Sequence, residues 1–166
     1  MNNLRTSCVT YFLAVHVVRM AIWRFEKRHP RRSKDRRRGR IGLLAGIGRL
    51  PVEFARAACG MGFAVTAIAL TPSVDAELKT VVTDYHEISI GQLDRIIAVL
   101  TAADVEEATL LGKVTKELMF SGQVTVDDRM KRMLAGLKDF SDDTLMLAFV
   151  KELASVNIGV LDQTAF

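Results

Sequence analysis

From residue 41 onward, short apolar runs alternate with segments that have helical spacing. The apolar runs suit buried parallel strands and lie at 41–45, 64–70, 85–90, 107–111 and 158–161. The helical segments lie between them, at 51–61, 75–82, 92–103, 125–138 and 142–156. This alternation predicts an α/β fold, in which helices cover both faces of a parallel sheet of about five strands.

Local signals mark the ends of two predicted helices. Ser141 can cap the last helix with its side chain, and the carboxylates of Asp142 and Asp143 complement the positive end of the helix dipole. Gly60 and Gly62 are suited to stop the first helix. Helix capping is therefore the interpretation that we give to the two aspartates.

The first strand, Ile41 to Ala45, runs into a glycine turn. Gly46 and Gly48 follow the strand, and Pro51 suits the first turn of the next helix because its missing N–H would be unpaired there anyway. A glycine turn lets a ligand approach the backbone, and the helix that follows directs free N–H groups at the same place. The pattern predicts a site for a phosphorylated ligand, although a structural turn without a ligand is an alternative.

An ordinary dinucleotide site is not what this turn predicts. The dinucleotide fingerprint has a third glycine near position 51, where this chain has proline, and an acidic residue after the second strand. Here the second strand is followed by Thr71, Pro72 and Ser73. The phosphorylated ligand is therefore expected to be something other than NAD.

Three loops are expected to converge if the first and fourth strands are neighbours. Ligands of such sheets bind at the carboxyl ends of the strands, where the strand order reverses. The loops follow the first, fourth and last strands, and they offer cationic side chains for a phosphate and neutral ones for a sugar or base. The predicted substrate-binding residues are Gly46, Ile47, Gly48, Arg49, Leu50, Gly112, Lys113, Val114, Gln163 and Thr164.

The charge of the chain divides it into two unlike parts. Residues 1–40 carry 12 Lys+Arg against 2 Asp+Glu, and residues 41–166 carry 11 against 17. The folded domain, 41–166, is thus mildly acidic, and we expect no nucleic-acid binding by it. Cys8 and Cys59 form no motif, which favours a reducing compartment.

Residues 1–40 are expected to be a basic, disordered extension. Their apolar stretch, 9–18, is too short to span a bilayer, and the arginines follow it, unlike in a signal peptide. The extension could be a membrane-surface anchor, a nucleic-acid tail or sequence translated from a start codon placed too early. We favour the third interpretation.

Five blocks of the sequence resemble one enzyme family in their order and spacing. They are IGLLAGIGRLPVEFAR at 41–56, GQL at 91–93, LGKV at 111–114, SDDTL at 141–145 and VLDQTAF at 160–166. Over residues 41–166, the chain resembles the N-terminal domain of the LpxI-type UDP-2,3-diacylglucosamine pyrophosphatases. The resemblance implies a Rossmann-like domain that lines one side of a substrate site, with a C-terminal domain on the other side.

The resemblance also implies an activity. Such enzymes act in the lipid A biosynthesis of Gram-negative bacteria and hydrolyse UDP-2,3-diacylglucosamine to 2,3-diacylglucosamine 1-phosphate and UMP, with a divalent metal (Mg²⁺ or Mn²⁺). Their catalytic aspartate and much of their metal site belong to the C-terminal domain, which would begin where this chain ends, at Phe166. We therefore assign no catalytic residue and no metal ligand here, and expect the substrate-binding half of the hydrolase, inactive and without metal when alone.

One position departs from the family pattern, and the function and the location have alternatives. The family usually carries Asn or Gly where this chain has Ile47. The alternative function is a stand-alone Rossmann-type module that binds a nucleotide or a partner protein without catalysis. We expect a cytoplasmic location, free or peripheral at the inner face of the inner membrane, with a UDP-sugar lipid and the C-terminal domain as partners. Self-association into a homo-oligomer is left open.

Overall fold

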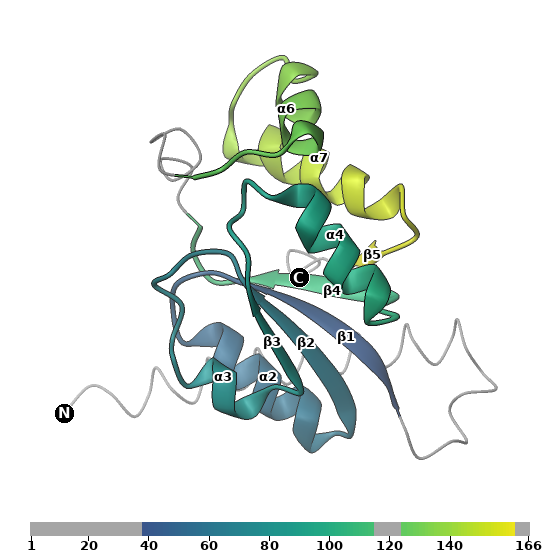
Figure 1. Ribbon diagram of the computed structural model, residues 1–166. Helices are drawn as coiled ribbons and strands as arrows, with labels where there is room; N and C mark the ends of the chain where they lie inside the picture. Colours follow the sequence, from purple (N-terminus) through teal and green to yellow (C-terminus); the bar gives the residue numbers. More distant parts are fainter. Residues whose placement is uncertain (1–37, 115–123, 162–166) are drawn as a thin grey trace.

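The structure is a computed structural model that describes residues 38–114 and 124–161, and its centre is a parallel sheet. The strands are β1 (Arg38–Ala45), β2 (Phe63–Ala69), β3 (Asp84–Glu87), β4 (Glu107–Leu111) and β5 (Gly159–Val160). They lie in the order β3-β2-β1-β4-β5, and each neighbouring pair is parallel (Figure 1). The chain therefore has the predicted Rossmann-like α/β fold, with the strand order reversing between β1 and β4.

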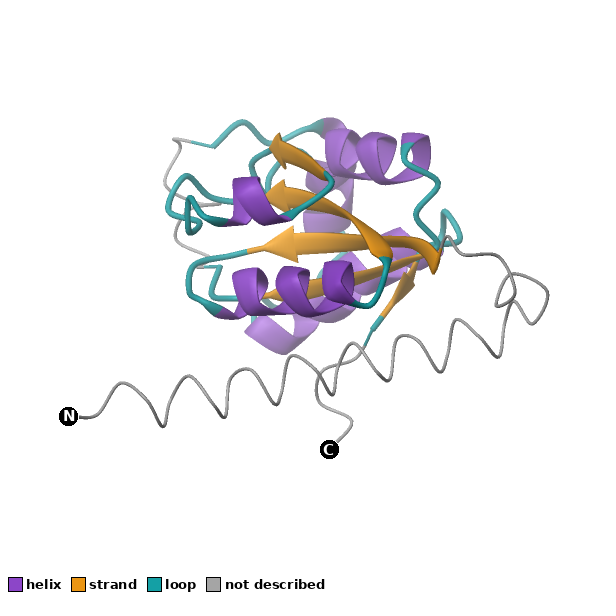
Figure 2. Ribbon diagram, turned by 90° about the horizontal axis from the view of Figure 1, so that it is seen from below, coloured by secondary structure: helices purple, strands orange, loops and turns teal. Residues whose placement is uncertain are grey.

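Helices cover both faces of this sheet (Figures 1 and 2). They are α2 (Leu50–Gly60), α3 (Leu78–Val81), α4 (Leu93–Ala102), α6 (Asp128–Ala135) and α7 (Asp142–Ala154). The helices α2 and α3 share one hydrophobic core with the sheet, whereas α4, α6 and α7 share the other. Every predicted helix is present, with ends that differ by a few residues.

The two cores follow from the alternation of side chains along the strands. On β1, Leu43 belongs to the core beneath α2 and its neighbour Leu44 to the core beneath α4; both are buried. Gly42 is two residues before Leu44 and so lies on the same face of β1, where a Cβ would lie 2.8 Å from the Cδ2 atom of Leu100. The absence of a side chain at Gly42 therefore lets α4 pack closely on β1.

Strand β1 begins at Arg38, three residues before the predicted start. The guanidinium of Arg40 donates a hydrogen bond to Thr66 Oγ1 at 3.1 Å and forms an ion pair with Asp84, so it links the first three strands. Residues 38–40, which the sequence assigned to the basic extension, thus belong to the sheet. The remainder of that extension, 1–37, lies outside the described residues, and its expected disorder stays a prediction.

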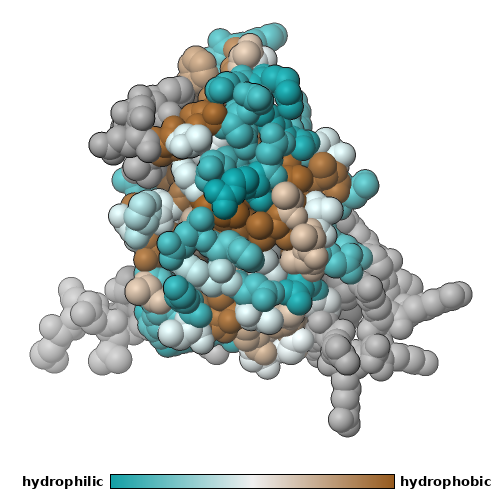
Figure 3. All heavy atoms as spheres, viewed as in Figure 1, coloured by the Kyte–Doolittle hydropathy of each residue, from teal (hydrophilic) through white to brown (hydrophobic). Residues whose placement is uncertain are grey.

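The surface drawn in Figure 3 is mostly hydrophilic, and hydrophobic atoms reach it in several separate groups. Exposed large hydrophobic side chains include Phe140, Met146 and Leu147, which lie at or near the start of α7. Within residues 38–114 and 124–161, no helix is long and apolar enough to cross a membrane.

Candidate functional site

Two of the three predicted loops meet at the edge where the strand order reverses. The N–H of Gly46 donates to Leu111 O at 2.7 Å, which ties the end of β1 to the end of β4. Beyond it, Ile47 and Lys113 form an antiparallel bridge, in which each N–H donates to the other residue's carbonyl at 2.8 Å. The structure thus brings the loop 46–49 against the loop 112–114, as the strand order required.

The glycines of these loops serve two different purposes. A Cβ at Gly46 would lie 2.6 Å from Lys113 O, and one at Gly112, whose φ is +88°, would lie 2.8 Å from the carbonyl of Gly46. These two glycines are therefore required for the close approach of the loops. Gly48 has a φ of +121°, and a Cβ there would meet nothing within 4 Å, so its backbone faces open space.

The loop after β1 leads directly into α2. Arg49 occupies the N-cap position without a side-chain cap, and its carbonyl accepts the N–H groups of Val52 and Glu53 at 3.1 and 3.2 Å. No acceptor within the described part of the chain is bonded to the N–H of Gly48, Arg49 or Leu50. These donors and the positive end of the helix dipole make the edge suitable for an anion.

The side chain of Arg49 is already neutralised. Its guanidinium pairs with Asp75 at 3.0 Å, with Glu77, and with Glu53 at 3.2 Å. The hydrogen bond to Asp75 is the main cause that raises the pKa of Arg49 above its usual value. Sequence reasoning assigned Arg49 to a phosphate but missed Asp75 and Glu77, which lie in the loop after β2 and carry no motif. In the structure, Arg49 links this loop to the start of α2.

Lys113 is the cation that this edge leaves available. Its side chain is exposed, and none of the described carboxylates forms an ion pair with it. Ile47, its bridge partner, is 39% exposed beside it, whereas Leu50 is half-buried and packs on the core beneath α2. The predicted Gln163 and Thr164 lie outside the described residues, so their place at this edge stays a prediction.

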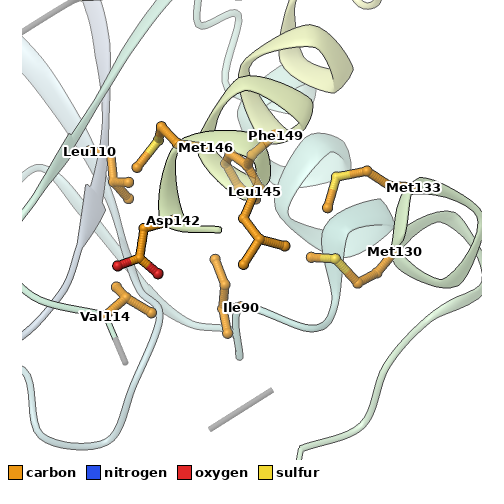
Figure 4. Close-up of a pocket in the computed structure, with 9 residues that line it drawn as sticks. All are labelled: Ile90, Leu110, Val114, Met130, Met133, Asp142, Leu145, Met146 and Phe149. Carbon is orange, nitrogen blue, oxygen red and sulfur yellow. The ribbon is translucent and has the colours of Figure 1, made fainter. Parts of the chain in front are cut away.

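Val114 points to a different environment, an apolar pocket of about 130 Å³ on the α4 side of the sheet (Figure 4). The pocket is lined by Ile90, Leu110, Val114, Met130, Met133, Asp142, Leu145, Met146 and Phe149. Sequence reasoning missed it because its walls come from separate elements, and apolar residues at helical spacing are typical of a core. Asp142 lies in the first turn of α7, whose predicted cap is confirmed: Ser141 Oγ accepts the N–H of Thr144 at 3.3 Å.

The described residues do not fit a divalent metal. No group of three or more His, Cys, Asp or Glu side chains within residues 38–114 and 124–161 could hold one. Near the candidate site, Glu53, Asp75 and Glu77 are occupied by Arg49 and Arg56. These carboxylates are therefore engaged by arginines rather than arranged as metal ligands.

The fold and the paired loops define a Rossmann-like domain with a candidate anion site where its strand order reverses. The sequence of residues 40–166 matches the model of one family, described as the LpxI N-terminal domain. The chain belongs to this family. It is therefore a domain related to the enzymes of the lipid A pathway.

Solved structures of two D-lactate dehydrogenases are similar at a lower level. The apo enzyme of Escherichia coli is 15% identical with a TM-score of 0.45, over 95% of this chain and 58% of that one. The NAD⁺ form from Lactobacillus jensenii is 17% identical with a TM-score of 0.33, over 76% and 46%. The chain spans about half the length of these structures, and similarity at this level says nothing of ligand or reaction. No curated protein matches the chain.

Proposed function

We propose that this domain is the substrate-binding half of a UDP-2,3-diacylglucosamine hydrolase. The complete enzyme would convert its substrate and water to 2,3-diacylglucosamine 1-phosphate and UMP. Membership of the LpxI N-terminal domain family supports this reaction, and the geometry of the two paired loops supports the place where the diphosphate binds.

The observation that carries the proposal is the bridge between Ile47 and Lys113. It places the lysine of one loop at the edge where the other loop presents unbonded N–H groups at the start of α2. A diphosphate is a strong anion, and it gains charge-assisted hydrogen bonds from an ammonium group and from the N–H groups of a helix start. Both kinds of donor are present here.

Six of the predicted residues then have a direct role. The N–H groups of Gly48, Arg49 and Leu50 bind phosphate oxygens, and the Lys113 ammonium neutralises their charge. Gln163 and Thr164 contact the sugar or the base. The Arg49 guanidinium stays with Asp75 and Glu77 and holds the loop in place.

The chemical step requires groups that we assign to a second, C-terminal domain. In this proposal, that domain would supply the catalytic aspartate and the Mg²⁺ or Mn²⁺ site, and the residues described here would contribute substrate binding. We place the reaction in the cytoplasm, with the enzyme free or peripheral at the inner face of the inner membrane, a surface that suits a substrate with two acyl chains.

The proposal is tested by the affinity of the full chain for UDP and UMP, measured by NMR titration. With half of the cleft supplied, we expect a Kd near 1 mM, which corresponds to about −4 kcal/mol. Lys113→Ala should weaken binding about tenfold or more, because a hydrogen bond to a charged group contributes roughly 1.5–3 kcal/mol.

The matched control is Lys138→Ala, which removes an exposed lysine beyond α6 and should leave the affinity unchanged. Equal affinity of the Lys113→Ala variant and the parent protein would refute the proposed site. A micromolar Kd would favour the alternative, a self-sufficient nucleotide-binding module.

A further inference from the structure

The apolar pocket adjoins the candidate diphosphate site. Val114 lines the pocket, and the preceding residue, Lys113, bridges to Ile47 at the edge of the sheet. Lys113 and Val114 are consecutive, with Cα atoms about 3.8 Å apart, so the pocket adjoins the loop that carries the lysine. The two features therefore form neighbouring parts of one surface.

The lining of the pocket selects an aliphatic group. Three of its side chains are the methionines Met130, Met133 and Met146, whose flexible thioethers adapt to an irregular apolar ligand. Among the lining side chains, Asp142 is the one that carries a charge, and in Figure 4 its carboxylate lies on the side of Val114 and Leu110. The other lining side chains could not satisfy the hydrogen bonds of a sugar or a nucleobase, so burial of either would be unfavourable.

The size of the pocket limits how much of a chain can enter. An engineered apolar cavity of about 150 Å³ binds benzene, and this pocket measures about 130 Å³. It can hold a few methylene groups, and hence the end or one segment of a longer alkyl chain.

We propose that this pocket binds part of one fatty acyl chain of a ligand whose phosphate lies at Lys113. The polar half of this statement rests on the proposed function. The apolar half rests on the pocket itself, so an alkyl compound without phosphate should enter it.

The probe is a series of straight-chain 1-alkanols from butanol to decanol, added to the full chain with ¹³C-labelled methionine methyl groups. The methyl signals of Met130, Met133 and Met146 should shift together. Met61, which packs on the core beneath α2 on the other face of the sheet, should not respond. Each methylene that enters the pocket should tighten binding about fourfold, which is 0.8 kcal/mol per buried CH₂, and the gain should stop once the pocket is full.

A pair of substitutions on one helix tests the location. Met146→Trp should fill the pocket and weaken decanol binding at least tenfold. Leu147→Trp is the control, since Leu147 is 61% exposed and does not line the pocket, and it should bind decanol like the parent protein. Should Met146→Trp unfold the protein, Val114→Phe fills the pocket from the β4 side.

The inference is overturned if the three methionine signals do not shift, if affinity rises with chain length without a limit, or if both tryptophan variants behave alike. Its failure can be told from failure of the proposed function. Alkanol binding without UDP binding would support the pocket and refute the diphosphate site. UDP binding without alkanol binding would refute the pocket alone.

Discussion

Asp127 caps two helices with one carboxylate. Its Oδ1 atom accepts the N–H of Met130 at 2.8 Å in the first turn of α6, and its Oδ2 atom accepts the N–H of Asp94 at 2.6 Å in the first turn of α4. Its own N–H donates to Gly91 O at 3.0 Å. Asp127 therefore fixes the starts of two helices that both contribute to the core on that face of the sheet.

Asp127→Ala should lower the free energy of unfolding by about 2 kcal/mol, because each lost cap costs roughly 1 kcal/mol. Asp127→Asn keeps an acceptor oxygen for one helix and should lose about half as much. Urea unfolding followed by circular dichroism measures both. Asp128→Ala, which removes an exposed neighbour paired with Lys131, is the control, and an equal loss in the control would contradict the double cap.

At the scale of residues, the sequence predicts hydrogen bonds between residues that are close together along the chain. The cap by Ser141 was predictable because its acceptor atom bonds the N–H of Thr144, three residues along the chain. The second bond of Asp127, to Asp94, spans 33 residues, and no spacing rule signals it. The partners of Arg49 could not be predicted for the same reason. Its positive charge is evident from the sequence, but Asp75 and Glu77 lie 26 and 28 residues away along the chain.

At the scale of elements, the strand–turn–helix unit from β1 to α2 was predictable and is confirmed. The apolar run, the glycines and Pro51 together determine where the strand ends and the helix begins. The ion pairs of Arg49 with the loop after β2 alter the chemistry of this unit, since they place carboxylates beside a helix start that should attract anions.

Removing these carboxylates should therefore strengthen anion binding. The double variant Asp75→Asn/Glu77→Gln leaves the Arg49 guanidinium paired with Glu53 alone among the described carboxylates, and the affinity for UDP should rise severalfold and depend more strongly on salt. Stability should fall by about 1 kcal/mol or less, because the pairs are largely exposed. Titrations with UDP at two salt concentrations measure the change.

The control double variant, Asp128→Asn/Asp143→Asn, makes the same change of net charge at the starts of α6 and α7. An increase of the same size in this control would assign the effect to overall charge. Unchanged or weaker binding by the Asp75/Glu77 variant would show that the network supports the anion site rather than competing with it.

At the scale of the whole molecule, the alternation of strands and helices was sufficient to predict the architecture. A parallel sheet buried on both faces needs apolar strands and amphipathic helices, and both patterns are visible in the sequence. The apolar pocket was not predictable, because Leu110, Met133 and Phe149 belong to different elements and each has the pattern of a core residue. The pocket forms between these elements, so it depends on how they pack against one another.

The boundary of the folded domain can be located by two deletions. Removing residues 1–37 should leave the free energy of unfolding within about 1 kcal/mol of the parent, as an extension outside the fold requires. Removing residues 1–40 should destabilise further, because Arg40 then no longer bonds Thr66 and Asp84. Thermal unfolding compares the two, and a large loss with the shorter deletion would show that the first 37 residues pack on the domain.

The central claim is that a phosphate binds where the loops after β1 and β4 meet. The most direct measurement is the change in backbone amide signals of the ¹⁵N-labelled full chain during titration with UMP. The account predicts shifts concentrated at Gly48, Leu50 and Lys113, and no shifts at Lys138 and its neighbours beyond α6. Saturating UMP that shifts none of these three amides, or that shifts residues on another edge of the sheet, would contradict it.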